Sequence, residues 1–110
     1  MWSEPSKTVL SKIPKLYETE EVPMKEKIVY LHFFIGNTDW YAIEYDENKR
    51  IFFGFVILGG DTRNAEWGYF PFDELREISI SGFQVDCETP FKQKKAIEIE
   101  KIREAYNFSD

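Results

Sequence analysis

Carboxylates are the residues of this sequence whose types and spacing come closest to a chemical site. Glu44 and Asp46 stand two positions apart in a segment expected to be a strand, so both would share one face with Trp40. Glu66 and Asp86 fall in two later expected strands. Carboxylates that converge from several strands can bind Mg²⁺ or Ca²⁺, or act as an acid and a base. The simpler interpretation is that these carboxylates lie on a solvated sheet face and that Asp46 favours a turn after the strand.

The other residues that catalysis or metal binding requires are scarce. His32 lies in an apolar run and is expected to be a partly buried, hydrogen-bonded residue rather than a ligand or base. Cys87 stands between Asp86 and Glu88, whose charges disfavour a thiolate. We therefore predict no catalytic residue, no metal site and no cofactor, and we favour a protein that is not an enzyme.

Aromatic side chains are abundant, with Trp 3, Tyr 6 and Phe 10. Five rings in neighbouring strands resemble the platforms on which single-stranded nucleic acids stack, namely Trp40, Tyr41, Tyr45, Trp67 and Tyr69. Such platforms need a basic groove, and this stretch carries net negative charge. Packing in the core and on the sheet is therefore expected for these rings. The candidate binding surface that the acids and rings define is Trp40, Tyr41, Glu44, Asp46, Glu66, Tyr69 and Asp86.

Composition excludes several classes of protein. The chain has 110 residues, of which 43% are hydrophobic, and its formal charge is −6, so we expect a single domain over residues 1–110. One cysteine excludes an intramolecular disulfide framework, and one histidine excludes multi-histidine metal sites. No apolar run approaches the roughly 20 residues of a membrane helix, and the N-terminus lacks signal and transit features, which predicts a cytoplasmic protein without membrane contact. The pI near 4.9 argues against binding along a phosphate backbone.

Periodicity and turn residues predict an α+β fold. We expect a mainly antiparallel meander of four or five strands, with a short helix capped by Ser3 that ends by Ile13 and a C-terminal helix that begins at Thr89-Pro90. A further short helix is predicted over 71–78. The expected strands are 28–35, 40–45, 51–58, 66–70 and an edge strand over 82–87.

The third expected strand, 51–58, is apolar on both faces. A half-exposed strand alternates apolar and polar residues. Either elements of the same chain cover both faces, which is the favoured interpretation, or a partner chain covers one of them.

The sheet segments resemble a known family in their order along the chain. The elements that carry the resemblance are Leu16–Glu20, Phe33-Phe34, Trp40–Asp46, Phe52–Val56 and Glu66–Leu75. Together they resemble domain-of-unknown-function family 2958, small bacterial and phage proteins often encoded on mobile elements, over roughly residues 10–100. Val85 precedes Asp86 here, where that family usually has an arginine. The resemblance implies that the protein is encoded on a mobile genetic element, and it implies no biochemical activity.

Three functional hypotheses follow from these features. The favoured one is a non-enzymatic protein-binding module of a mobile genetic element, whose acidic middle segment meets an unidentified protein partner or a second copy of the chain. The first alternative is an enzyme or metal-binding protein that uses Glu44, Glu66 and Asp86. The second alternative is nucleic-acid binding through Trp40, Tyr41 and the turn 92–95, which the acidic charge makes the least favoured.

Overall fold

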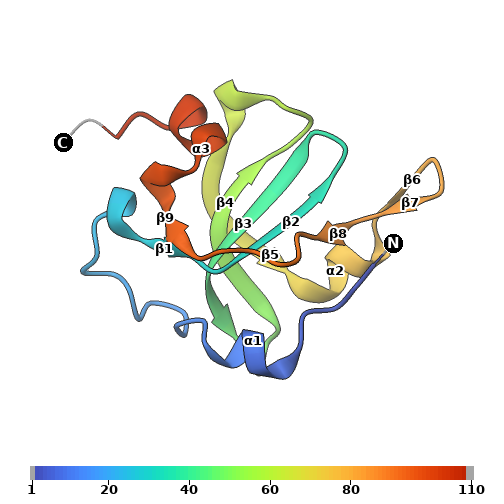
Figure 1. The fold of residues 1–110 in the computed structure, drawn as a ribbon, viewed down its shortest axis with the longest axis horizontal. Helices are drawn as coiled ribbons and strands as arrows, with labels where there is room; N and C mark the ends of the chain where they lie inside the picture. The colour runs from blue at the N-terminus through green and yellow to red at the C-terminus, as the bar shows by residue number, and fades with distance from the viewer. Residues whose placement is uncertain (1, 109–110) are drawn as a thin grey trace.

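A five-stranded antiparallel sheet forms the centre of the computed structural model, which describes residues 2–108 (Figure 1). Its strands lie in the order β5-β4-β3-β2-β8. Their bounds are β2 Leu31–Ile35, β3 Thr38–Asp46, β4 Ile51–Ile57, β5 Glu66–Pro71 and β8 Asp86–Cys87. Strands β2 to β5 follow one another as a meander, and β8 adds antiparallel to the free edge of β2. The predicted α+β class and antiparallel sheet are confirmed.

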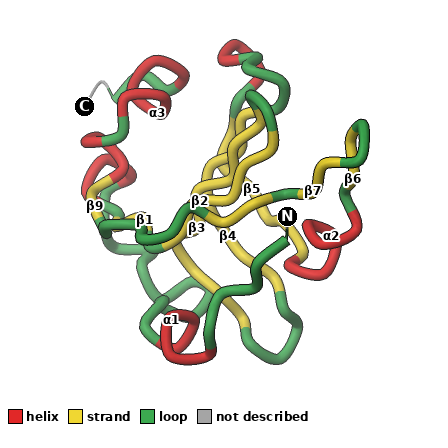
Figure 2. Tube along the Cα trace, turned by 45° about the vertical axis from the view of Figure 1, so that its right-hand side comes forward, coloured by secondary structure: helices red, strands yellow, loops and turns green. Residues whose placement is uncertain are grey.

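Short helices and two small strand pairs surround this sheet (Figure 2). The α-helices are α1 Lys7–Ser11, α2 Phe72–Glu77 and α3 Glu100–Ala105, and the 3₁₀ turns are η1 Met24–Glu26, η2 Thr62–Asn64 and η3 Ala96–Glu98. Strand β1 Ile28–Val29 pairs with β9 Lys94–Lys95, and β6 Ser79–Ile80 pairs with β7 Phe83–Gln84. In the part of the chain that the structure describes, no helix is long and apolar enough to cross a membrane.

Turn chemistry explains why the meander forms where it does. Gly36 has φ +56° in the β2–β3 turn, a conformation that glycine adopts without a steric penalty. The β3–β4 turn is stabilised by Asp46, whose Oδ1 accepts hydrogen bonds from the backbone of Asn48 and Lys49. The prediction that Asp46 serves a turn is confirmed.

Both ends of the chain differ from the sequence predictions. Helix α1 is capped by Ser6, whose Oγ accepts from the Val9 amide at 3.2 Å, and not by Ser3. The helix expected from Thr89-Pro90 is wrong, because α3 begins only at Glu100. Lysines at 92–95 would oppose the dipole of a helix that began there, and two of them pair with β1 instead.

Two expected strands are divided. The run 28–35 separates at Tyr30 into β1 and β2, which pair with different partners. The expected edge strand 82–87 separates at Val85, which is fully buried, into β7 of a hairpin and β8 of the main sheet. Each division lets one continuous apolar segment join two sheets.

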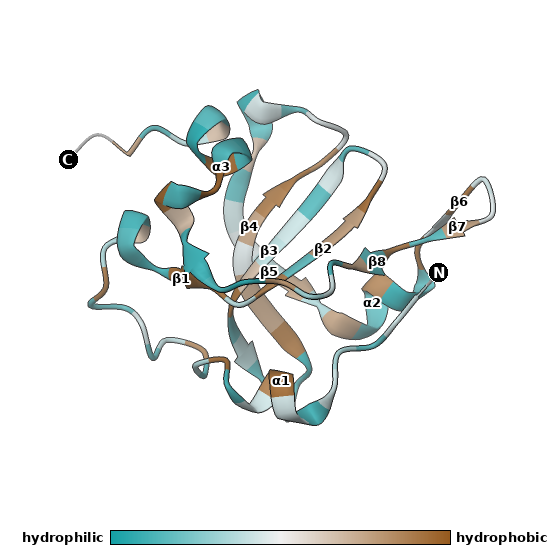
Figure 3. Cartoon of the chain, viewed as in Figure 1, coloured by the Kyte–Doolittle hydropathy of each residue, from teal (hydrophilic) through white to brown (hydrophobic). Residues whose placement is uncertain are grey.

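The hydrophobic core lies in two clusters, one on each face of the sheet. One cluster is built around Phe33, Phe52 and Phe72, and the other around Ile43, Phe55 and Ile102. Strand β4 contributes to both, which agrees with the hydrophobic residues along it in Figure 3. Both apolar faces of this strand are therefore covered within the chain, as the favoured interpretation predicted.

Candidate functional site

A β-bulge in β3 decides which face of the sheet Glu44 occupies. Ala42 lies opposite Gly54 and Glu44 lies opposite Phe53, so Ile43 has no partner of its own in the ladder. Residues directly opposite in an antiparallel pair share a face. Glu44 therefore shares the face of Phe53, and Trp40 lies on the other face. The prediction that Glu44 and Trp40 share a face is wrong, because the extra residue shifts the alternation by one.

Glu44 is buried, with 4% of its surface exposed, and every charge-bearing oxygen is hydrogen-bonded. The amide of Tyr17 donates to Oε1 at 2.8 Å, and the amide of Thr19 donates to Oε2 at 3.0 Å. The Thr19 hydroxyl also donates to Oε2. Tyr17 has φ +71°, which lets the chain turn so that both amides face the carboxylate. Glu44 thus anchors the irregular segment 15–27 to the sheet.

Lys27 completes this buried polar cluster. Only 5% of Lys27 is exposed, and its Nζ donates to the carbonyl of Thr19 and to Thr19 Oγ1, the latter at 2.9 Å. Thr19 therefore connects the ammonium group to the Glu44 carboxylate. A buried charge is costly unless it is hydrogen-bonded, and here the two opposite charges are both hydrogen-bonded and are linked through the Thr19 hydroxyl.

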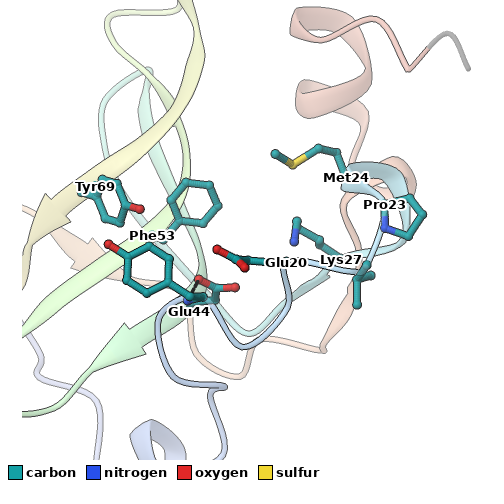
Figure 4. A pocket seen from close by; sticks show the side chains of 9 residues that line it. Glu20, Pro23, Met24, Lys27, Glu44, Phe53 and Tyr69 are labelled. Carbon is teal, nitrogen blue, oxygen red and sulfur yellow. Dashed lines mark hydrogen bonds between the residues drawn. The ribbon is translucent and has the colours of Figure 1, made fainter.

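A cavity of about 450 Å³ lies beside this cluster, between the sheet and segment 15–27. Its lining residues are Tyr17, Glu20, Val22, Pro23, Met24, Lys27, Glu44, Phe53 and Tyr69. Figure 4 shows Phe53 and Tyr69 on one side, Pro23 and Met24 on the other, and Glu20 between them. The volume falls within the range of roughly 300 to 1,000 Å³ that is typical of ligand pockets.

Three rings form one wall of this cavity, and we call Tyr17, Phe53 and Tyr69 the aromatic wall. The ring centroids of Phe53 and Tyr69 are 5.2 Å apart, and those of Tyr17 and Tyr69 are 6.4 Å apart. Tyr17 is 60% exposed and Tyr69 is 54% exposed, although both are large apolar rings. Hydrogen bonding to Tyr17 raises the pKa of Tyr69, and burial and the charges of Glu44 and Glu20 raise it further. Glu44 and Glu20 therefore lie close enough to Tyr69 for their charges to act on it.

The remaining predicted surface residues do not join this site. Trp40 and Tyr41 are both buried, on opposite faces of the sheet. Glu66 lies opposite Val56, as Trp40 does, so it shares the face away from Glu44. Asp86 lies on β8, at the sheet edge opposite to β5.

Glu44, Glu66 and Asp86 therefore do not converge. They lie on β3 and on the two outermost strands, and Glu66 also faces the other way. Within residues 2–108, no group of three or more histidine, cysteine or acidic side chains is arranged to hold a metal ion. Of the predicted surface, only Glu44 and Tyr69 line the cavity.

His32 belongs to a separate network that joins three parts of the fold. Its Nε2 lies 2.7 Å from Asp39 Oδ1, and its Nδ1 lies 2.6 Å from Glu88 Oε1. Lys101 of α3 donates to Asp39 Oδ2 at 3.0 Å, and the imidazole stacks on Tyr41 with centroids 4.5 Å apart. Both ring nitrogens are occupied, so His32 has none available to act as a base on a substrate. The expectation of a hydrogen-bonded, partly buried histidine is confirmed.

Sequence reasoning missed most of the cavity. Tyr17, Glu20, Met24 and Lys27 lie in a stretch that reads as an irregular polar crossing, without periodicity. The available signal was a tyrosine and a methionine within an acidic run, together with the Leu16–Glu20 element of the family resemblance. Phe53 belongs to the strand expected to be covered on both apolar faces, and it lies opposite Tyr69 at the cavity.

Comparisons of the chain with protein-family models, with curated proteins and with solved structures give no match. Function is therefore inferred from the geometry of the site.

Proposed function

We propose that this chain is a non-enzymatic protein-binding module whose docking site is the aromatic wall and the cavity beside it. The observation that carries the proposal is the exposure of Tyr17 and Tyr69 at the mouth of a cavity with an acidic lining. Tyrosine is enriched at protein interfaces because its ring offers apolar area and its hydroxyl remains able to hydrogen-bond.

The polar groups of the site support binding rather than catalysis. Glu44 and Lys27 are committed to hydrogen bonds with segment 15–27, so both act as parts of the scaffold. The sheet and the buried Glu44 anchor hold the wall in place, and a preorganised surface lowers the entropic cost of association.

Charge favours a basic partner. The chain carries −6, and Glu20 and Glu44 line the cavity beside the aromatic wall. Complementary charge raises the rate of association and orients the partner more than it adds affinity. We further propose a bacterial cytoplasmic setting on a mobile genetic element, which rests on the resemblance to domain-of-unknown-function family 2958.

Affinity capture from a nuclease-treated lysate of the source organism tests the proposal when three forms are compared. The wild-type chain should capture a partner protein in a nearly equal molar amount, and the Tyr69→Ala variant should not capture it. Phe83→Ala, which changes a 70% exposed ring on the β6–β7 hairpin, should retain it. A protein lost equally from both variants, or none that depends on Tyr69, would contradict docking at the aromatic wall. A protein captured by the wild type from an untreated lysate but not from the nuclease-treated lysate would indicate nucleic-acid binding instead.

A further inference from the structure

We infer that the cavity accepts a basic side chain, arginine or lysine, that projects from the partner protein. This inference rests on the proposed function and adds the chemistry of what enters the site. It is carried by the charge balance of the lining residues and by the arrangement of apolar groups around Glu20 (Figure 4).

The cavity lining carries one net negative charge, because it holds the carboxylates of Glu20 and Glu44 and the ammonium group of Lys27. Glu44 and Lys27 are both hydrogen-bonded to Thr19, which holds one negative and one positive charge of the lining near each other. Among residues 2–108, the ion pairs do not include Glu20, although its carboxylate lines the cavity. A cation in the cavity would therefore find the exposed carboxylate of Glu20, in a lining whose two carboxylates outnumber its one ammonium group.

The apolar groups of the lining match the rest of a basic side chain. A cation is attracted to the face of a tyrosine or phenylalanine ring within about 6 Å, and Phe53 and Tyr69 present such rings next to Glu20 (Figure 4). On the opposite side, Met24 and Pro23 provide apolar surface for a methylene stem. Arginine and lysine bury their stems along apolar surface and keep the charge at the polar end.

The arrangement favours a side chain over a small quaternary ammonium compound. Quaternary ammonium groups are recognised by cages of several aromatic rings. The rings here form one wall, and the wall opposite is aliphatic and thioether. Tyr17 and Tyr69 at the mouth are exposed, so an occupant can remain attached to a larger protein.

Nuclear magnetic resonance titration of the ¹⁵N-labelled chain tests this inference. The probes are the N-acetyl methylamides of arginine and lysine, with those of citrulline and norleucine as uncharged controls of similar shape. The basic probes should produce saturable shifts of the Phe53 and Tyr69 amides, and the uncharged probes should bind about fivefold more weakly. Binding of the basic probes should weaken as salt is added.

Two neighbouring carboxylates provide a matched pair of variants. Glu20→Gln should weaken binding of the basic probes about fivefold, whereas Glu21→Gln changes an adjacent exposed residue that does not line the cavity and should change it less than about twofold. Neither position is part of the buried Glu44 cluster, so both variants should fold as the wild type does, which their amide spectra will show.

Any one of several results would overturn the inference. The citrulline and arginine probes could bind with equal affinity, or neither basic probe could shift the amide signals at the cavity. The Glu20→Gln and Glu21→Gln variants could also lose equal affinity for the basic probes. Binding of tetramethylammonium without binding of either basic probe would assign the cavity to a small ligand and would also overturn it. If the captured partner still requires Tyr69 but ignores Glu20→Gln, the proposed function stands and the basic side chain is excluded.

Discussion

A Cβ atom built on Gly54 would lie 1.8 Å from the carbonyl oxygen of Tyr41 on the neighbouring strand. Gly54 pairs with Ala42, the residue at which the bulge of β3 begins. The backbone of β3 therefore occupies the space of a side chain at position 54. The bulge that turns Glu44 toward the cavity requires a glycine across from it.

Gly54→Ala should destabilise the fold by about 3 kcal/mol, because backbone cannot move aside as a flexible side chain can. Gly68 is the matched control, since it lies directly opposite Gly54 on β5 and a Cβ there meets nothing within 4 Å. Gly68→Ala should change the free energy of unfolding by less than about 0.5 kcal/mol. Urea unfolding followed by tryptophan fluorescence compares the two, and coincident midpoints would contradict the close approach.

Glu44→Gln should destabilise the chain by about 2 kcal/mol, because it removes the buried negative charge that Thr19 links to the buried Lys27 ammonium. Glu47→Gln, in the exposed turn after β3, is the control and should be nearly neutral. In a double-mutant cycle with Lys27→Met, the coupling free energy should exceed about 1 kcal/mol. Additive losses at the two positions would show that Glu44 and Lys27 do not act together.

Asp39→Asn should make the stability of the chain less sensitive to acid. Burial opposes ionisation of Asp39, but hydrogen bonds from His32 and Lys101 outweigh it and lower its pKa. A lowered folded-state pKa means that ionised Asp39 stabilises the fold above its ordinary value of about 3.9, and that this contribution is lost as the pH falls through the folded pKa.

The measurement is the free energy of unfolding of both proteins between about pH 7 and pH 2. Asp39→Asn should be less stable than the wild type near neutral pH, and the two stabilities should become similar in acid. Glu104→Gln, on the exposed side of α3, provides a comparison of equal charge change. Parallel curves for wild type and Asp39→Asn would contradict the assignment.

Cys87 should be unreactive in the folded chain. Burial raises the pKa of its thiol to about 11, and the charges of Glu88 and Asp86 contribute. Since the thiolate is the reactive form, reaction with a disulfide reagent at about pH 8 should be about a hundredfold slower than in the chain unfolded by guanidinium. Equal rates in the two states would show that the thiol is accessible and its pKa ordinary.

Local patterns account for the parts of the fold that the sequence predicted well. Strands β3, β4 and β5 begin and end within two residues of the predicted bounds, because glycine, asparagine and aspartate punctuate alternating aromatic and β-branched runs. The start of α3 was predicted wrongly because Thr89-Pro90 matches a helix start locally, while long-range pairing of β9 with β1 determines the structure there.

The site was harder to predict than the fold, for two physical reasons. The bulge at Ile43 leaves no mark in the sequence, since apolar residues continue through it, yet it moves Glu44 to the other face. Segment 15–27 has no periodicity, and its conformation depends on hydrogen bonds to Glu44, a residue far along the chain. Of the predicted surface residues, Glu44 and Tyr69 are the two that line the cavity, which the sequence did not predict.

Site-specific photo-crosslinking in cells tests the central claim most directly. A photoreactive phenylalanine analogue replaces Tyr69 in one strain and Leu58, which is 62% exposed beyond the end of β4, in another. Docking at the aromatic wall predicts a discrete crosslinked protein from position 69 and none from position 58. Identical adducts from both positions, or none from position 69 while the chain is folded and abundant, would contradict it.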